Sequence, residues 1–288
     1  MTVAPCGLPG VTQLADFPGI AAMWTVGRIW IYPIKSLPGV EVSQSYVLPA
    51  GNLQHDREFA LIDETGQIMN AKRSPAVHRV RAAWDLADWS VTLAERSSDT
   101  GELSPAVRLH LDLDRDAISH WFSTLFEMPL TLVQQPAGGY PDDRDSPGPT
   151  VVSTASLDAV AGWFPELNPE EMRYRFRANL ELSGCLPFDE DQLVPGSESA
   201  VPFQVGEATL YGTNPCQRCV VPTRSPETGA VLTGFQKRFS ERREATFRAS
   251  ASRLRFNHFY RLSVNTTVRA KDSQLIRVGD CVQVTPVL

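Results

Sequence analysis

The chain lacks a long apolar run and a basic start. No segment reaches the roughly 18 apolar residues that a membrane helix requires, and residues 1–23 contain neither Lys nor Arg. Proline and glycine interrupt these first residues, so they lack the unbroken apolar stretch of a secretory signal. We therefore expect no membrane span, a cytoplasmic location and a flexible N-terminal tail over residues 1–23.

Cysteine and histidine are also scarce. Of five cysteines, Cys6, Cys185 and Cys281 stand alone, and the five histidines form no H-x-x-x-H pair. The ligands of a structural zinc site or of an iron–sulfur cluster are therefore not expected. An odd, mostly isolated set of cysteines argues against a secreted disulfide framework and favours a reducing compartment.

Basic residues are fewer than acidic residues overall. The net charge is −6 and the pI is near 5.4, so no nucleic-acid partner is expected. Residues 236–256 are a local exception, because they hold seven Lys or Arg against two Glu. This pattern predicts a solvated amphipathic helix. No G-x-G-x-x-G follows a strand-like segment, so a flavin or nicotinamide site is not expected either.

What is present indicates a mainly β (α+β) fold with few short helices. With 288 residues, of which 42% are hydrophobic and 21% charged, the chain has an ordinary globular composition and room for two domains. Short β-rich segments separated by turn signals begin at Trp24. They cover residues 26–35, 40–48, 58–62, 67–70 and 91–93.

A linker-like stretch divides the chain. Residues 134–149 are rich in Gly, Pro and Asp and have the composition of a linker or lid. We expect an N-terminal β unit over residues 24–135 and a second unit over residues 136–288. Helical spacing predicts helices at residues 116–126 and 156–164. Strand patterns are expected in the second unit at residues 175–183, 208–211, 259–264 and 275–284.

The paired cysteines Cys216 and Cys219 are the chain's most informative motif. A disulfide oxidoreductase would place such a pair at a helix N-terminus. Here Val220, Val221, Pro222 and Thr223 follow, and this run predicts a strand and then a turn. The motif therefore favours a thiolate offered to a soft centre, beside the positive charge of Arg218.

Several polar elements end apolar segments, where functional sites are often mounted. They are Lys35-Ser36, Asp56-Arg57, Arg175 with Arg177, Asn179, and Arg218-Cys219. Each one alone is compatible with a surface salt bridge. Together with a candidate thiolate they favour an anionic ligand, because Arg offers a planar fork of donors and Lys a compact charge.

The order of these motifs resembles one known family. The series runs Tyr32-Pro33-Ile34-Lys35-Ser36, Asp56-Arg57, Phe176-Arg177-Ala178-Asn179, Cys216-Gln217-Arg218-Cys219 with Pro226-Glu227-Thr228-Gly229, and Val278-Gly279-Asp280. Over roughly Trp24 to Leu288 it is similar to the MOSC proteins, the molybdenum-cofactor sulfurase C-terminal domain family. The layout is nearest to its amidoxime-reducing members. The resemblance implies a β-barrel MOSC domain packed with an N-terminal β-barrel-like domain.

The resemblance also implies a site for the molybdenum cofactor, a pterin dithiolene bearing a phosphate. Cys219 would be the metal ligand and the catalytic residue, and Arg218 next to it could favour its ionised form. Asp145-Ser146 matches more loosely, and Phe259 falls where the amidoxime-reducing members have a tyrosine. The implied cofactor-binding residues are Lys35, Ser36, Arg57, Ser146, Arg177, Asn179, Gln217, Arg218 and Phe259.

Cys216 has two interpretations. It is either a small buried hydrophobe that supports the turn, which we favour, or a second thiol for persulfide or disulfide chemistry.

Functions of different classes stay open. In the first, the protein is an oxidoreductase for N-hydroxylated or related N-oxygenated small molecules, and an external reductase, ferredoxin or cytochrome-type carrier supplies the electrons. In the second, it is a cofactor carrier or sulfur-transfer protein with a persulfide on Cys219. Pyridoxal phosphate would then be found only on a partner desulfurase. A binding module that has lost its cofactor is the third.

Overall fold

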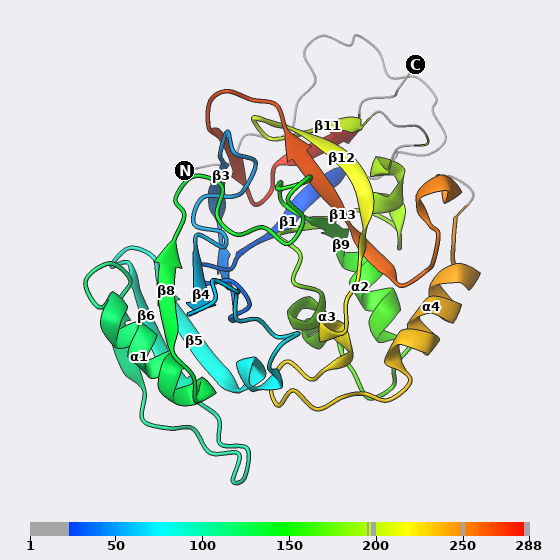
Figure 1. The fold of residues 1–288 in the computed structure, drawn as a ribbon. Coiled ribbons are helices and arrows are strands. Elements are labelled where there is room, and N and C mark those ends of the chain that lie inside the picture. The colour runs from blue at the N-terminus through cyan, green and yellow to red at the C-terminus, as the bar shows by residue number, and fades with distance from the viewer. Residues whose placement is uncertain (1–22, 195, 197–199, 249–250, 285–288) are drawn as a thin grey trace, which may run out of the picture.

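The computed structural model describes residues 23–194, 196, 200–248 and 251–284 (Figure 1). Within them the fold is mainly β with short helices, as predicted. Apart from Met23, the expected N-terminal tail lies outside the described residues. No helix in the described ranges combines the length and apolarity needed to cross a membrane.

Seven strands form a closed barrel in the order β10, β9, β13, β12, β11, β15 and β1, and pairing of β1 with β10 closes it. Closure leaves no free edge between these strands. Val26, Ile29, Phe203, Leu210 and Val264 belong to its buried core. The strands are β1 (Trp24–Ile31), β9 (Val151–Ser153), β10 (Leu180–Ser183), β11 (Val201–Val205), β12 (Ala208–Gln217), β13 (Arg261–Val268) and β15 (Cys281–Val284).

A second unit packs beside the barrel around its own core (Figure 1). Its helix α1 (Arg115–Phe126) buries Ile118 and Phe122 one turn apart, which is the spacing that predicted it. The buried side chains of Phe59, Leu61 and Val91 belong to the same cluster. The other elements are η1 (Pro75–Arg79), β4 (Phe59–Asp63) with β8 (Leu130–Gln134), and β5 (Val80–Asp85), β6 (Ser90–Glu95) and β7 (Val107–His110).

Three strands from the first part of the sequence pack with the barrel core rather than with the second unit. Besides closing the barrel, β1 pairs with β2 (Val40–Val42) and with β15. Strand β3 (Gln44–Val47) pairs with β14 (Gln274–Arg277). The division between residues 135 and 136 stays a prediction. The pairings of β1 with β10 and β15 and of β3 with β14 cross it.

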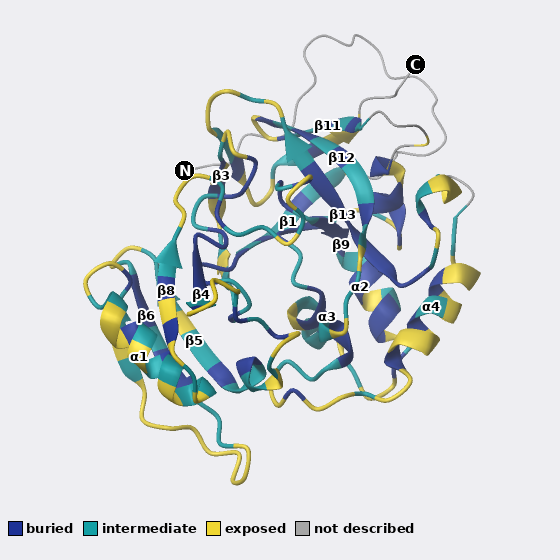
Figure 2. Ribbon diagram, viewed as in Figure 1, coloured by how far each residue is buried: buried dark blue, intermediate teal, exposed yellow. Residues whose placement is uncertain are grey.

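Three helices cover one side of the barrel and share an aromatic core. They are α2 (Thr154–Ala161), α3 (Pro169–Phe176) and α4 (Phe235–Ala245), and Phe164, Phe176, Phe235, Phe239 and Tyr260 pack between them. The basic segment forms α4, and Figure 2 shows its mixture of exposed and buried residues. Arg243 departs from the predicted solvated face, because its side chain is fully buried.

Three local predictions are wrong. Residues 175–183 are not one strand, because Asn168 caps α3, Pro169 occupies its first turn and the helix continues to Phe176. The residues after Cys219 form a 3₁₀ turn, η3 (Val221–Thr223), rather than a strand. The Thr223 hydroxyl and N–H donate to the Val220 carbonyl at 2.7 and 3.0 Å and hold the turn.

Residues 67–70, also predicted as a strand, contribute only an isolated bridge between Ile62 and Ile68. The remaining 3₁₀ segments are η2 (Asp189–Leu193) and η4 (Arg253–Arg255).

A buried ionic cluster lies between α4 and the η2 segment. Arg243 pairs with Asp191 and packs against the Phe188 and Phe256 rings at 4.2 and 5.3 Å. Glu190 accepts a hydrogen bond from the Ser156 hydroxyl at 2.8 Å. Burial, and then the charge of Asp191, raise the pKa of Glu190 to about 7.

The raised pKa of Glu190 predicts a pH-dependent stability. Folding favours the protonated acid, so this contribution is full below the ordinary glutamate range and is lost as pH rises towards 7. We expect Glu190→Gln to be more stable than the parent above pH 7 by roughly 1–3 kcal/mol. Urea unfolding at pH 5 and pH 8 measures this. A parent protein with equal stability at both pH values would contradict it.

Candidate functional site

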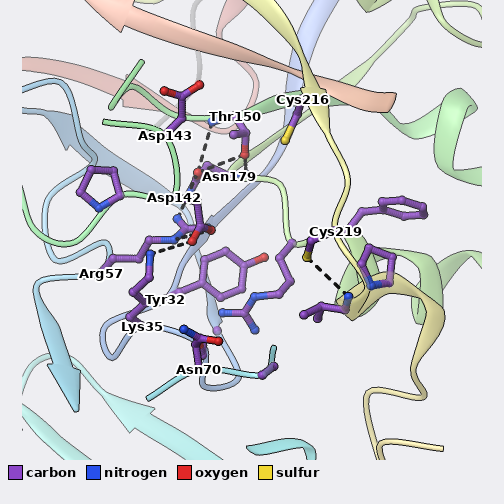
Figure 3. A pocket seen from close by; sticks show the side chains of 18 of the residues that line it. Tyr32, Lys35, Arg57, Asn70, Asp142, Asp143, Thr150, Asn179, Cys216 and Cys219 are labelled. Carbon is purple, nitrogen blue, oxygen red and sulfur yellow. Dashed lines mark hydrogen bonds and ion pairs between the residues drawn. The ribbon is translucent and has the colours of Figure 1, made fainter. Parts of the chain in front are cut away.

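One cavity of about 1060 Å³ is lined by residues from both units. Nine of the ten residues predicted for the site belong to its lining, although they come from segments far apart in the sequence. They are Lys35, Ser36, Arg57, Ser146, Arg177, Asn179, Gln217, Arg218 and Cys219. Figure 3 shows Lys35, Arg57, Asn179 and Cys219 around this space.

Cys219 follows the end of β12 and is half-buried in the cavity wall. The 3₁₀ turn after it aims a backbone donor at the sulfur, since the Val221 N–H donates to Cys219 Sγ at 3.4 Å (Figure 3). A donor of this kind suits a sulfur that carries negative charge. The turn thus fixes the direction of a candidate metal-binding sulfur.

Arg218 contacts the other cysteine. Its Nη1 lies 3.1 Å from Cys216 Sγ and its Nη2 donates to the Phe176 carbonyl at 2.6 Å. The hydrogen bond of Arg218 thus goes to Cys216, and the influence of its charge on the Cys219 sulfur stays a prediction. The preferred interpretation of Cys216 as a buried hydrophobe is wrong. The register shifts between Pro215 and Gln217, and Cys216 is half-buried and lines the cavity.

Three of the predicted anion-binding residues share a disfavoured backbone conformation. Ser36, Arg57 and Arg177 have φ values of 73°, 52° and 53°. Non-glycine residues in this left-handed region cost about 1 kcal/mol or more each, and such strain concentrates at functional sites. At Arg177 the conformation ends α3.

Tyr32 gathers two of the cations. The guanidinium carbons of Arg57 and Arg177 lie 5.0 and 4.1 Å from the centre of its ring, within cation–π range. Burial raises the pKa of Tyr32 to about 12, so the phenol stays neutral, and its hydroxyl donates to the Ala178 carbonyl at 3.2 Å. The sequence placed Tyr32 inside a motif but gave no signal of this role.

Arg57 is held in place by polar side chains. Its Nη1 donates to Asp56 Oδ2 at 2.5 Å and approaches Asn179 Oδ1 at 3.5 Å. The Asn179 amide also donates to the Trp30 carbonyl and accepts from Thr150. Asn179 therefore links β1 to the segment before β9 and positions Arg57.

Arg177 differs from Arg57 in its partners. Among the described residues its guanidinium has no hydrogen-bond or ion-pair partner, and the Tyr32 ring is its contact. Burial lowers the pKa of Arg177, but a guanidinium remains charged in proteins. The cavity wall thus offers an anion a positive charge that no direct ion pair neutralises.

Family models match both parts of the chain. The MOSC N-terminal beta barrel domain matches residues 23–129, and the MOSC domain matches residues 149–283. The chain belongs to the MOSC family. Mitochondrial amidoxime-reducing component 1 of Homo sapiens is 27% identical over 241 residues, which cover 72% of this MOSC chain and 68% of the relative.

Molybdenum cofactor sulfurases are similar as well. That of Oryza sativa subsp. japonica is 25% identical over 244 residues, covering 71% of this chain and 29% of the relative. That of Homo sapiens is 23% identical over 263 residues, covering 76% and 28%. The MOSC chain thus spans less than a third of the length of these sulfurases.

Two predicted residues lie elsewhere or act differently. Phe259 is not part of the cavity lining, because it packs in an aromatic cluster with Phe247, Phe256 and Arg253. Arg175 lines the cavity, but its guanidinium is already bound to other groups of the protein. It pairs with Glu171 at 2.7 Å and donates to the carbonyls of residues 222 and 224, so it braces the turn after Cys219.

Asp142 could not be selected from the sequence, because it lies on the loop between β8 and β9. Its carboxylate accepts from Lys35 Nζ at 2.6 Å and lies 3.7 Å from Arg57 Nε (Figure 3). Desolvation by the cavity wall opposes ionisation, but Arg57 and Lys35 hold the pKa of Asp142 well below its usual range. The Asp142 side chain is 74% exposed whereas Lys35 is 11% exposed, so the carboxylate is the accessible partner.

This geometry predicts that Asp142 competes with an external anion. Asp142→Asn removes the counter-charge of Lys35 and Arg57, so we expect a lower melting temperature and about 3- to 10-fold tighter binding of inorganic phosphate. Calorimetric titration and thermal unfolding measure the two effects. The control is Asp145→Asn, an exposed position on the same loop. Equal phosphate affinity in parent and Asp142→Asn would refute the competition.

Proposed function

We propose that this MOSC protein binds the molybdenum cofactor in the cavity and reduces N-hydroxylated or related N-oxygenated compounds. The observation that carries the proposal is that three cationic side chains and a candidate metal-binding sulfur line the same cavity. Lys35, Arg57 and Arg177 supply cations on the same cavity into which Cys219 presents its sulfur. The similarity to an amidoxime-reducing component supports the choice of reaction.

The donor set suits the cofactor. A phosphate tail requires fixed cations, and the unpaired guanidinium of Arg177 beside Arg57 on the Tyr32 ring provides them. A metal already held by dithiolene sulfur accepts a soft thiolate, which Cys219 would provide. Ser36, Ser146, Gln217 and Arg218 would add polar contacts from the cavity wall.

When bound, the cofactor would supply the two-electron redox change. Reduction of an N-hydroxylated substrate breaks the N–O bond, consumes two electrons and two protons, and releases the oxygen as water. The chain's own contribution is to hold the cofactor tail, fix the Cys219 sulfur through the Val221 N–H, and shape the substrate space. An external reductase, ferredoxin or cytochrome-type carrier would deliver the electrons, and a cytoplasmic location stays a prediction.

A carrier or sulfur-transfer role is the second candidate. A second thiol favours it, because Cys216 lines the same cavity with the Arg218 guanidinium 3.1 Å from its sulfur. The similarity to molybdenum cofactor sulfurases supports it too. Cys219 would carry a persulfide, and the sulfur would come from a partner desulfurase that holds pyridoxal phosphate.

Metal content and turnover separate the two roles. The protein is purified from a host that makes the cofactor, and molybdenum per chain is measured together with reduction of benzamidoxime by an artificial electron donor. Near-stoichiometric metal with turnover supports the reductase, whereas cofactor without turnover and a persulfide on Cys219 support the carrier.

The ligand assignment predicts unequal roles for the two cysteines. Cys219→Ala should lower benzamidoxime reduction at least about 100-fold, because the sulfur that completes the metal shell is lost. The matched variant Cys216→Ser removes the neighbouring sulfur but keeps a small polar side chain, and it should retain most of the turnover. Reduction that survives the Cys219→Ala change would show that another residue holds the metal.

A further inference from the structure

The cavity extends beyond the residues assigned to the cofactor. One further wall is built from η1, the start of β5 and the segment after η3, and it contains His78, Arg81 and Arg224. Val221 and Pro222, two and three residues after Cys219, also line the cavity. The wall therefore belongs to the same space as the candidate metal-binding sulfur.

The two arginines of this wall are oriented by backbone carbonyls. Arg81 donates to the carbonyls of His78 at 2.9 Å, Val80 at 3.0 Å and Glu227 at 2.8 Å. Arg224 donates to the Ala71 carbonyl. In the described part of the chain neither guanidinium forms a salt bridge with a carboxylate. Carbonyls fix the direction of an arginine without neutralising its charge.

Positive charge dominates this region. His78 is subject first to burial and then to the charges of Arg224, Arg177, Arg175 and Arg81, which together lower its pKa to about 4. The imidazole of His78 is therefore neutral near pH 7 and adds no charge to the wall. Lys72 also lines the wall, and the acidic group facing it is the exposed carboxylate of Glu227.

We propose that this wall, defined by Arg81 and Arg224, is a subsite for an acidic group of the substrate. The inference rests on the proposed reductase function and names its substrate class: N-hydroxylated compounds that carry a carboxylate or a comparable anion away from the N–O bond. The cofactor tail would occupy Lys35, Arg57 and Arg177, and this leaves Arg81 and Arg224 to recognise the substrate. Two guanidinium forks match the planar geometry of a carboxylate.

The subsite predicts a measurable substrate preference. We expect kcat/KM for 4-carboxybenzamidoxime to exceed that for benzamidoxime by roughly 10-fold or more, mainly through KM, because the carboxylate would gain charge-assisted hydrogen bonds from arginine. The preference should shrink as ionic strength rises. Arg81→Gln and Arg224→Gln should each lower the ratio of the two kcat/KM values several-fold. Arg81→Lys, which keeps the charge but not the fork, should give an intermediate ratio.

The control and the failures are separable. Arg108→Gln changes an exposed arginine on β7 of the same three-stranded sheet, where it pairs with Asp85 and Asp88, and should leave the ratio unchanged. Calorimetric titration of 4-carboxybenzamidoxime without an electron donor tests the subsite independently of turnover. If binding depends on the carboxylate but neither compound is reduced, the proposed reductase function is refuted and the proposed subsite is supported. Reduction of both compounds with equal kcat/KM overturns the subsite and keeps the reductase.

Discussion

Repulsion between like charges is the constraint on which this site depends. Lys35, Arg57 and Arg177 line one cavity, and desolvation disfavours the charged form of each. Two contacts offset this repulsion. The Tyr32 ring makes cation–π contacts with Arg57 and Arg177, and Asp56 and Asp142 provide negative charge. Cations held in this way would need little reorganisation to bind the proposed anionic ligand.

Backbone geometry and charge support each other here. Left-handed conformations at Ser36, Arg57 and Arg177 turn the chain where a regular strand or helix would have continued. The surrounding packing must supply the free energy that keeps these residues strained, and the aromatic core against α3 and α4 is the nearest source for Arg177. The stability of the helices α2, α3 and α4 and the geometry of the proposed anion site are therefore linked.

Much of this arrangement could be predicted from the sequence because its motifs carry their own chemistry. Lys35, Arg57, Arg177 and Cys219 stand out as polar residues that end apolar segments, and they do line one cavity. Contacts between side chains from different segments could not be predicted from the sequence in the same way. Arg218 is adjacent to Cys219 in sequence, yet its side chain turns to Cys216 and Phe176. Asp142 sits in a loop whose composition says nothing about where its carboxylate will point. Residues 175–183 alternate like a strand, but helix capping by Asn168 outweighs that pattern.

The seam between β1 and β10 has a consequence for the order of events during synthesis. Ile29 pairs with Leu180, so the first strand leaves the ribosome long before its neighbour exists. Lys35 follows that strand and Arg177 precedes β10, so the two parts of the proposed anion site come together only when β1 and β10 pair. Loading of the proposed ligand is therefore a late event. It requires Cys219 and the pairing of β15 with β1, both of which come after residue 180 and long after the N-terminal unit.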